Sequence, residues 1–404
     1  MVWTVPRYLI FKPVFNPVRI AFGLCALAFL LRLAAVVIAP GHFWAYTVYY
    51  GMAQTLAGGG GWCLSPGLAC AYFPPVYPSI LATGILTGHP VPAIAIAGAL
   101  AGAGTVWFVW LIARHLFGTT TGLLAAAYAA LYPYFVWHDA VLQETGTLAF
   151  VVTVTVFLLV RGKTWIITGA MLALTVLTKA NLLLFIPAAL LWIAVTSSLR
   201  RLLWTTLGVA LLLSPWVART WYVTGSPILY SNGGFALWTA QHRRTFDYFP
   251  QQSIDEASNS ELEELPPAQR QQFDPVTDPN GVRRSAWFWN QGIEFIKAGT
   301  KTNPGLTLQR AVYKVWIAFS PVFSPAQSAA FEAVYFLSYF PLFVLSGIGA
   351  WRARGQWREL GFIYMLMLTF AIGTAVFWGH TSHRMYLEPC LIILSARAVI
   401  STST

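Results

Sequence analysis

Acidic side chains are scarce in this sequence and missing from its first third. The chain has 14 Asp and Glu residues against 25 Lys and Arg, and its first acidic residue is Asp139. Charged residues of both signs make up 10% of the chain, whereas soluble proteins contain about 25%. So little charge cannot cover a water-exposed surface, which excludes an ordinary soluble enzyme.

Cysteine is also rare, with four residues in the chain. Cys63 and Cys70 share one stretch between two apolar runs, and their spacing permits a small disulfide-closed loop in an oxidising compartment. The sequence around the pair has no His or carboxylate, which disfavours a zinc site. Cys25 and Cys390 lie inside apolar runs and are expected to be packing residues.

Long apolar runs are what the chain has in abundance. Hydrophobic residues make up 57% of its 404 positions, and a run of about 20 such residues can cross the ~30 Å hydrocarbon core of a bilayer as a helix. We therefore predict an all-α integral membrane protein. Its ten expected spans are residues 19–38, 91–113, 121–136, 145–160, 165–177, 182–195, 202–217, 331–350, 361–378 and 386–400.

The basic residues decide the topology. The formal charge of +11 would suggest nucleic acid in a soluble chain, but here the Lys and Arg residues gather in short loops at one set of span ends, as cytoplasmic loops do. This pattern holds only if Val76–Leu86 does not cross the bilayer, so we expect a juxtamembrane helix there. The basic start shows no cleavage site, and both termini are expected in the cytoplasm.

Five regions follow from this topology. Residues 1–38 hold the cytoplasmic N-terminus and first span, and residues 39–90 form an outer loop with juxtamembrane helices. Residues 91–218 hold spans two to seven, residues 219–330 a large outer loop with interfacial helices, and residues 331–404 the last three spans. The large loop carries nine of the 14 acidic residues, and its Glu-rich run at residues 261–264 is expected to be solvated surface.

The stretch 41–79 is built unlike a membrane span. It combines an aromatic amphipathic piece, four consecutive glycines at residues 58–61, the two cysteines and a Pro-Pro-Val-Tyr-Pro turn. We expect it to form an ordered segment that covers a site at the outer membrane surface.

Ionisable residues at outer span ends are the candidates for chemistry, because charge there is otherwise rare. Carboxylates there can also cap helices, and cations there can reach toward the interface. Cations that converge on one outer site, however, would suit a phosphate at the level of the lipid headgroups. The set comprises Asp139, Glu144, Lys179, Arg219, His380, His383 and Arg384.

A turn at residues 230–238 adds aromatic and amide groups to the outer side. Its Asn-Gly-Gly sequence is typical of a tight turn with exposed amides. The aromatic residues around it could stack on the face of a sugar.

The order of these pieces resembles the bacterial polyprenyl-phosphate-sugar glycosyltransferases of the GT-C fold, especially the protein O-mannosyltransferase and aminoarabinose-transferase-like enzymes. The resemblance extends over about residues 19–400. The matching pieces are Arg32 in the first span, residues 49–62, residues 74–78, Glu144, residues 169–179, residues 215–219, residues 232–238 and residues 383–389.

The resemblance implies transfer of a sugar from a polyprenyl-phosphate donor to an acceptor hydroxyl with inversion, outside a bacterial plasma membrane. The acceptor would be a glycan, a lipid or a protein. It implies that Lys179, Arg219, His383 and Arg384 contact the donor phosphate and that Glu144, together with Asp139, supplies acidic groups. The expected shaping residues are His42, Tyr49, Tyr77, Asn232 and Trp238. No cofactor is required, although a divalent metal at Glu144 stays open.

One position departs from the family pattern. The family carries an Asp on the first outer loop, four residues before the tyrosine that aligns with Tyr49, and Ala45 stands there. Three explanations remain: an inactivating Asp-to-Ala substitution made to trap a substrate complex, a different base (Asp139, Glu144 or His42), or a protein that binds the lipid without transferring sugar.

The alternative function is therefore a non-catalytic binder or a transporter of lipid-linked sugars. Transporters commonly show internal repeats and paired, Gly- or Pro-broken spans. The sequence shows no such halves, which favours the enzyme.

Overall fold

The computed structural model describes residues 16–242, 244–248, 250–252, 267–268 and 278–400. Within these ranges every regular element is a helix, and the one extended pairing is a bridge between Ser65 and Leu68. The predicted all-α class is confirmed. The basic chain start and the Glu-rich run at 261–264 lie outside the described residues.

Four helices are long and apolar enough, by length and composition, to cross a membrane: α1 (Pro17–Ile38), α5 (Pro90–Phe117), α11 (Leu199–Thr224) and α18 (Ala329–Arg352). Shorter helices complete the bundle: α6 (Thr119–Leu131), α7 (Pro133–Asp139), α8 (Thr145–Arg161), α9 (Trp165–Thr178), η1 (Ala180–Leu184), α10 (Phe185–Thr196), η2 (Arg354–Gln356), α19 (Gly361–Val376), η3 (Thr381–Leu387) and α20 (Glu388–Val399). Most match the expected spans within a few residues, but α11 continues to Thr224, and the third expected span, 121–136, is divided at Tyr132 into α6 and α7. Because several are shorter than a bilayer is thick, the count of ten crossings stays a prediction.

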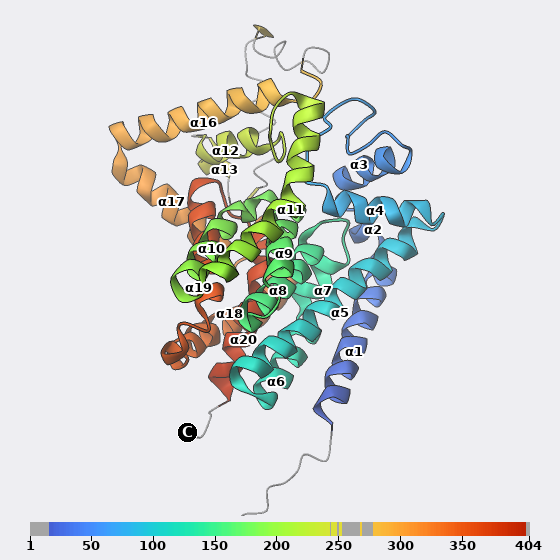
Figure 1. Ribbon diagram of the computed structural model, residues 1–404, viewed down its shortest axis with the longest axis vertical. Helices are drawn as coiled ribbons and strands as arrows, with labels where there is room; N and C mark the ends of the chain where they lie inside the picture. Colours follow the sequence, from blue (N-terminus) through green and yellow to red (C-terminus); the bar gives the residue numbers. More distant parts are fainter. Residues whose placement is uncertain (1–15, 243, 249, 253–266, 269–277, 401–404) are drawn as a thin grey trace, which may run out of the picture.

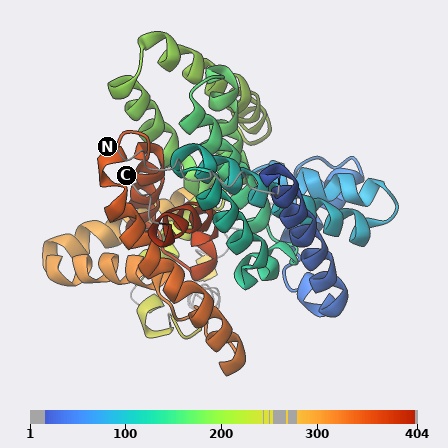
Figure 2. The same ribbon diagram turned by 90° about the horizontal axis from the view of Figure 1, so that it is seen from below.

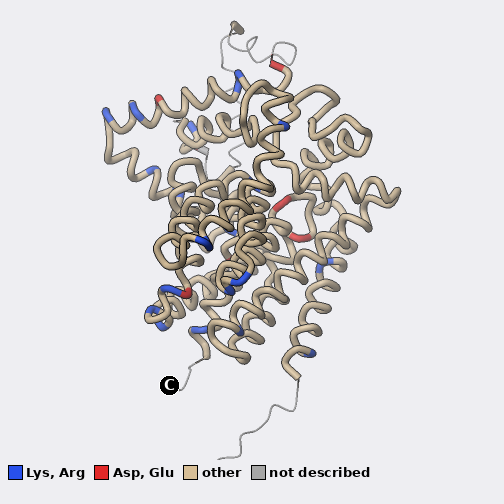
Figure 3. The backbone as a smooth tube through the Cα atoms, viewed as in Figure 1, with Lys and Arg blue, Asp and Glu red and all other residues tan. Residues whose placement is uncertain are grey.

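The bundle is arranged around α20, whose residues are buried along most of the helix. Seen from below, the N-terminal helices, the middle helices and the C-terminal helices occupy three sectors around the centre (Figure 2). Acidic positions are few among the described residues, and basic ones lie mainly near helix ends and on the outer helices (Figure 3).

Helices α9 and α11 pack closely because two glycines face each other's backbone. A Cβ at Gly169 would lie 1.9 Å from the Thr205 carbonyl oxygen, and one at Gly208 would lie 2.0 Å from that of Ile166. Only glycine permits this approach. The two helices therefore lie against each other near their N-terminal ends.

Two groups of outer helices cover one end of the bundle, and together they are called the roof here. The first group is α2 (Pro40–Phe43), α3 (Val48–Ala57) and α4 (Val76–Leu86); the second is α12 (Gly233–Gln241), α13 (Thr245–Tyr248), α16 (Val282–Thr302) and α17 (Pro304–Phe319). Figure 1 shows α16 crossing above α12 and α13. It also shows α4 lying across the end of α5, the orientation expected of a juxtamembrane helix.

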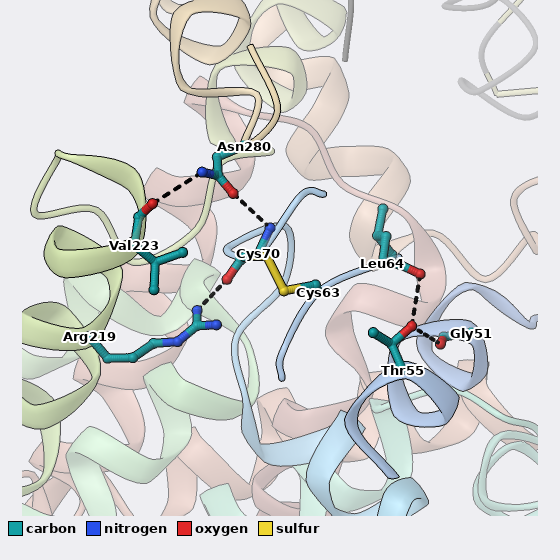
Figure 4. Close-up of a disulfide and its surroundings, with 8 residues drawn as sticks. All are labelled: Gly51, Thr55, Cys63, Leu64, Cys70, Arg219, Val223 and Asn280. Carbon is teal, nitrogen blue, oxygen red and sulfur yellow. Dashed lines mark hydrogen bonds between the residues drawn. A yellow bond between two sulfur atoms is a disulfide. The ribbon is translucent and has the colours of Figure 1, made fainter. Parts of the chain in front are cut away.

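The two groups of the roof are joined around the disulfide between Cys63 and Cys70 (Figure 4). The Cys70 amide donates to Oδ1 of Asn280 at 3.1 Å, and Nδ2 of Asn280 donates to the Val223 carbonyl at 3.2 Å. The side chain of Asn280, just before α16, thus links the first outer loop to the end of α11.

A buried lysine fixes the second group to the bundle. Nζ of Lys314, on α17, donates to the carbonyl oxygens of Val376 at 3.2 Å and Phe377 at 3.0 Å. Cations are favourable at a helix C-terminus, so Lys314 caps α19 from the roof.

Candidate active site

Lys179 and Glu144 form an ion pair under the roof. Lys179 directly follows α9 and Glu144 directly precedes α8. Nζ of Lys179 lies 2.5 Å from Oε1 of Glu144, and the two side chains are 16% and 2% exposed. The second carboxylate oxygen of Glu144 makes no hydrogen bond of standard geometry, although the Tyr49 hydroxyl approaches the carboxylate. The pair therefore presents a partly accessible cation backed by a buried carboxylate.

Two histidines of the loop before α20 lie beside this pair. Their rings are 5.9 Å apart, and Nδ1 of His380 lies 2.8 Å from Oγ of Ser382. Burial, followed by the charges of Lys179 and Arg384, lowers the pKa of His380 to about 3. Burial and then Lys179 also hold the pKa of His383 well below its usual value. Both imidazoles are therefore neutral near pH 7 and lie within electrostatic reach of Lys179.

His138 belongs to the same region and was missed in the sequence, where the adjacent Asp139 drew attention. Its ring is 6% exposed and packs edge-on against Tyr134 with centroids 4.4 Å apart. Burial and the nearby His380 and His42 lower its pKa to about 3. Neither ring nitrogen has a partner within hydrogen-bond distance, although the Gln143 side chain approaches.

Partnerless buried polar atoms gather around the ion pair. Besides the second carboxylate oxygen of Glu144 and the nitrogens of His138, they include Oγ1 of Thr145 and Nδ1 of His383. Buried polar atoms without a partner are rare in proteins. Glu144 and His383 were candidates in the sequence, but His138 and Thr145 were not, because burial and missing partners are properties of packing.

A large apolar cavity opens beside these groups. Its volume is about 920 Å³, and its lining comes from η1, the loop 226–230, the start of α12, α16, α19 and the segment before α20. His383 lines it, as do Ala180 and Asn181, which follow Lys179. Apolar walls with a few polar groups at one side are typical of a site for an amphiphilic ligand.

Aromatic residues of the first outer loop cover Glu144. Tyr49 and Tyr77 are buried with ring centroids 5.3 Å apart. Burial, and then the nearby Glu144 carboxylate, hold the pKa of both hydroxyls well above the usual value. The roof thus meets the candidate site through two tyrosines.

Ala45 lies in the loop between α2 and α3 and is exposed. Next to it, the ring of His42 stacks on Trp137 at 3.6 Å, and its Nε2 lies 2.8 Å from the Trp137 carbonyl oxygen. The loop is held further by a 3.1 Å bond from the Leu142 amide to the Phe43 carbonyl. Position 45 is therefore exposed and close to the turn between α7 and α8.

The expectation that Arg219 joins Lys179 at a phosphate does not match its contacts. Its guanidinium donates to the Cys70 carbonyl (Figure 4) and lies over the rings of Trp62 at 5.6 Å and Trp216 at 5.0 Å. These contacts anchor the disulfide loop to α11. The sequence placed Arg219 at the correct helix end but could not reveal which loop covers it.

Arg384 differs from the expectation as well. It is fully buried, with Nε 2.9 Å from Oε1 of Glu388 and Nη1 2.5 Å from the Ala318 carbonyl oxygen. Nη2 donates to the Tyr335 hydroxyl, and the guanidinium lies 3.6 Å from the centre of the Tyr339 ring. All of its donating groups serve the core, so it acts on the site only through its charge.

Asp139, predicted as an acidic site residue, is held in a buried ion pair. Its Oδ2 lies 2.5 Å from Nε of Arg32, and both side chains are buried at 3% and 1% exposure. The pair joins α7 to α1. Arg32 was recognised in the sequence without a partner, because the two residues are 107 positions apart.

Asn232 and Trp238 belong to the roof, at the start of α12 and within it. Asn232 precedes α12 and lines a second cavity of about 240 Å³. Trp238 is buried against Phe288, with ring centroids 4.9 Å apart. Among the described residues, no group of three or more His, Cys, Asp or Glu could hold a metal ion.

Comparison with known proteins gives a match to one family. The family model described as "Dolichyl-phosphate-mannose-protein mannosyltransferase" matches residues 73–221, which include Glu144, Lys179 and Arg219. No curated protein matches the sequence.

Solved structures resemble the whole described bundle. The oligosaccharyltransferase AglB of Archaeoglobus fulgidus, in complex with an inhibitory peptide and a dolichol-phosphate, aligns with a TM-score of 0.53 and 15% identity. The alignment covers 94% of this chain and 50% of AglB, so the chain spans about half the length of that enzyme. Its apo form aligns with a TM-score of 0.53 and 14% identity, covering 96% and 51%.

ArnT of Cupriavidus metallidurans bound to undecaprenyl phosphate aligns less well, with a TM-score of 0.41, 15% identity and coverage of 95% and 77%. The resemblance read from the sequence is confirmed by the family match and the fold. The chain has the GT-C fold of the oligosaccharyltransferase AglB, and its residues 73–221 match the mannosyltransferase family model.

Proposed function

We propose that the protein is an inverting glycosyltransferase that moves a sugar from a polyprenyl-phosphate donor to an acceptor hydroxyl on the outer face of a bacterial plasma membrane. The observation that supports this most directly is the position of Lys179 beside a 920 Å³ apolar cavity. A cation next to an apolar hollow suits a lipid phosphate, because the tail needs apolar walls and the headgroup needs positive charge.

In this proposal the prenyl chain occupies the cavity between α16 and α19, and the phosphate lies at Lys179. His383 lines the cavity and provides a neutral imidazole next to the phosphate. The sugar then points toward Glu144, Thr145 and His138, whose partnerless polar atoms would bind its hydroxyl groups. An unpaired buried polar atom costs about 1–3 kcal/mol, which a hydroxyl-rich ligand would recover.

The acceptor hydroxyl attacks the anomeric carbon from the side opposite the phosphate. A bond forms between the acceptor oxygen and that carbon, and the bond from the carbon to the phosphate oxygen breaks with its electron pair. Lys179 stabilises the negative charge on the departing phosphate. The hydroxyl proton passes to a general base on the acceptor side.

This chain departs from the family at the residue that would act as the general base. Asp139 is bound to Arg32 and Glu144 to Lys179, so each carboxylate is held in an ion pair, and neither takes the place of the family's Asp at position 45. His42 is close to that position, but its Nε2 contacts the Trp137 carbonyl. A chain with Ala45 would therefore bind the donor and transfer sugar slowly or not at all, which is also what a non-catalytic binder would do.

The test compares the chain with its Ala45→Asp variant, using a short-chain polyprenyl-phosphate sugar as donor. We expect donor binding in both and transfer at least 100-fold faster in the variant, as expected for general-base catalysis. Binding without transfer in both forms would support the binder. Absence of binding in both would refute the proposed donor site.

A further inference from the structure

A pocket lined by basic residues lies at the N-terminal ends of α9 and α11, away from the roof. It has a volume of about 520 Å³. It is called the basic pocket here, and its lining residues are Lys163, Thr164, Trp165, Ile166, Ile167, Ser198, Arg200, Arg201 and Trp204. Basic residues at cytoplasmic span ends are expected from the positive-inside rule, but a hollow between them is not.

No salt bridge among the described residues neutralises the positive charge of the pocket. Lys163, Arg200 and Arg201 line it, and the sequence contains no Asp or Glu from residue 145 to residue 246. In the part of the chain that the structure describes, the salt bridges involve other residues. The pocket therefore concentrates positive charge that attracts an anion.

The two helix starts add to this charge. Contact at Gly169 and Gly208 holds α9 and α11 together, and both begin at the pocket. Neither N-cap residue, Thr164 or Ser198, makes a side-chain cap bond. Each helix N-terminus carries about half a unit of positive charge and free amides, so their juxtaposition supports the cationic side chains.

The rim of the pocket is apolar and aromatic. The Arg201 guanidinium, on α11, lies 5.3 Å from the centre of the Trp165 ring, on α9. One cation of the pocket therefore reaches from α11 to α9. The lining residues Ile166, Ile167 and Trp204 are 39%, 52% and 45% exposed. A ligand with an anionic head and an apolar body fits this combination better than a small soluble anion does.

We propose that the basic pocket binds the headgroup phosphate of an anionic phospholipid from the leaflet opposite the roof. Lys163, Arg200 and Arg201 contact the phosphate, and the rim contacts the upper acyl chains. The pocket and the donor cavity lie at opposite ends of α9, which ends at Lys179. This proposal is therefore independent of glycosyl transfer.

Native mass spectrometry of the full-length chain in detergent tests the proposal. The probes are dioleoyl phosphatidylglycerol, dioleoyl phosphatidylcholine and sn-glycerol 3-phosphate. We expect the first to bind at least tenfold more tightly than the second, and Arg200→Gln with Arg201→Gln to weaken phosphatidylglycerol binding at least tenfold. Lys163→Gln alone should give a smaller loss in the same direction.

The chain offers a matched control in Arg354 and Arg358. They also stack on tryptophans, at 4.8 Å over Trp351 and 5.3 Å over Trp357, but do not line the pocket. Arg354→Gln with Arg358→Gln should leave phosphatidylglycerol binding unchanged. Equal losses in both double variants, or equal affinity for both lipids, would overturn the proposal. Displacement of the lipid by glycerol phosphate at equal concentration would also overturn it in favour of a soluble anion.

Discussion

Nζ of Lys179 lies 2.5 Å from Oε1 of Glu144, although 35 residues separate the two in sequence. The pair joins the end of α9 to the start of α8 and lies beside the apolar cavity of about 920 Å³. A lysine that is held by one carboxylate and is still 16% exposed can add a phosphate as a second partner. This relationship makes donor binding testable at a single side chain.

Lys179→Met should weaken binding of undecaprenyl phosphate and lower any transfer activity by about 10²- to 10³-fold, the range for loss of one stabilising donor. The measurement is lipid binding to the purified protein, combined with the transfer assay. Lys297→Met is the matched control, because Lys297 forms an exposed pair with Glu294 at 3.0 Å. Equal behaviour of the two variants would contradict the assigned role.

Asp139→Asn should destabilise the protein rather than impair its chemistry. The change leaves Arg32 buried without its anionic partner, a loss of about 3–5 kcal/mol for buried pairs. Thermal unfolding in detergent should show a clear drop, with Glu294→Gln as an exposed control. Normal stability with lost transfer would show instead that Asp139 is the base.

Removal of the disulfide by Cys63→Ser with Cys70→Ser should loosen the first outer loop. The cysteines are seven positions apart, and closing so short a loop contributes about 2–3 kcal/mol. Limited proteolysis should then cut within residues 58–72, whereas Cys25→Ser in α1 should leave the loop protected. Unchanged protection in the double variant would mean that the Arg219 and Asn280 contacts suffice.

Gly234→Ala should distort the donor cavity. A Cβ at this cavity-lining position would lie 1.9 Å from the Ser285 carbonyl oxygen, so α12 would have to move away from α16. We expect at least tenfold weaker binding of undecaprenyl phosphate by the same lipid-binding assay. Gly51→Ala is a suitable control, because no atom lies within 4 Å of that Cβ; equal affinities would argue against the cavity as the lipid site.

Acid should destabilise the protein through its buried histidines. The pKa of His138 and His380 is about 3 in the folded chain and about 6.5 when unfolded. Below about pH 6.5 the unfolded chain therefore binds more protons than the folded chain. These histidines leave the free energy of unfolding unchanged above about pH 6.5 and lower it as the pH falls toward 3. Each histidine would account for at most about 1.4 kcal/mol per pH unit.

Melting temperatures measured at pH 7.5, 6 and 5 check this expectation. His380→Gln should reduce the loss between pH 6 and pH 5, because one titrating group is gone. Identical melting temperatures at all three values would show that the histidines are hydrated and titrate normally.

Much of the architecture could be predicted from the sequence alone. Composition and run length required a helical membrane protein, since only helices satisfy the backbone of such apolar runs in lipid. The charge argument that kept Val76–Leu86 out of the bilayer agrees with α4 lying across the end of α5 (Figure 1). The ordered motifs led to the GT-C relationship, and Glu144 and Lys179 were identified as candidates before their pairing was known.

Only the tertiary structure shows which charged side chains already have a partner in the fold. Asp139, Arg219 and Arg384 have the same sequence signature as Lys179, a lone charge at a span end. Their partners are Arg32, the Cys70 carbonyl and Glu388, and the first two lie far away in the chain. His138 gave no sequence signal, since burial and missing partners are properties of packing. Local patterns determine helices because helical hydrogen bonds are local, whereas the exposure of a charge depends on which distant segments fold over it.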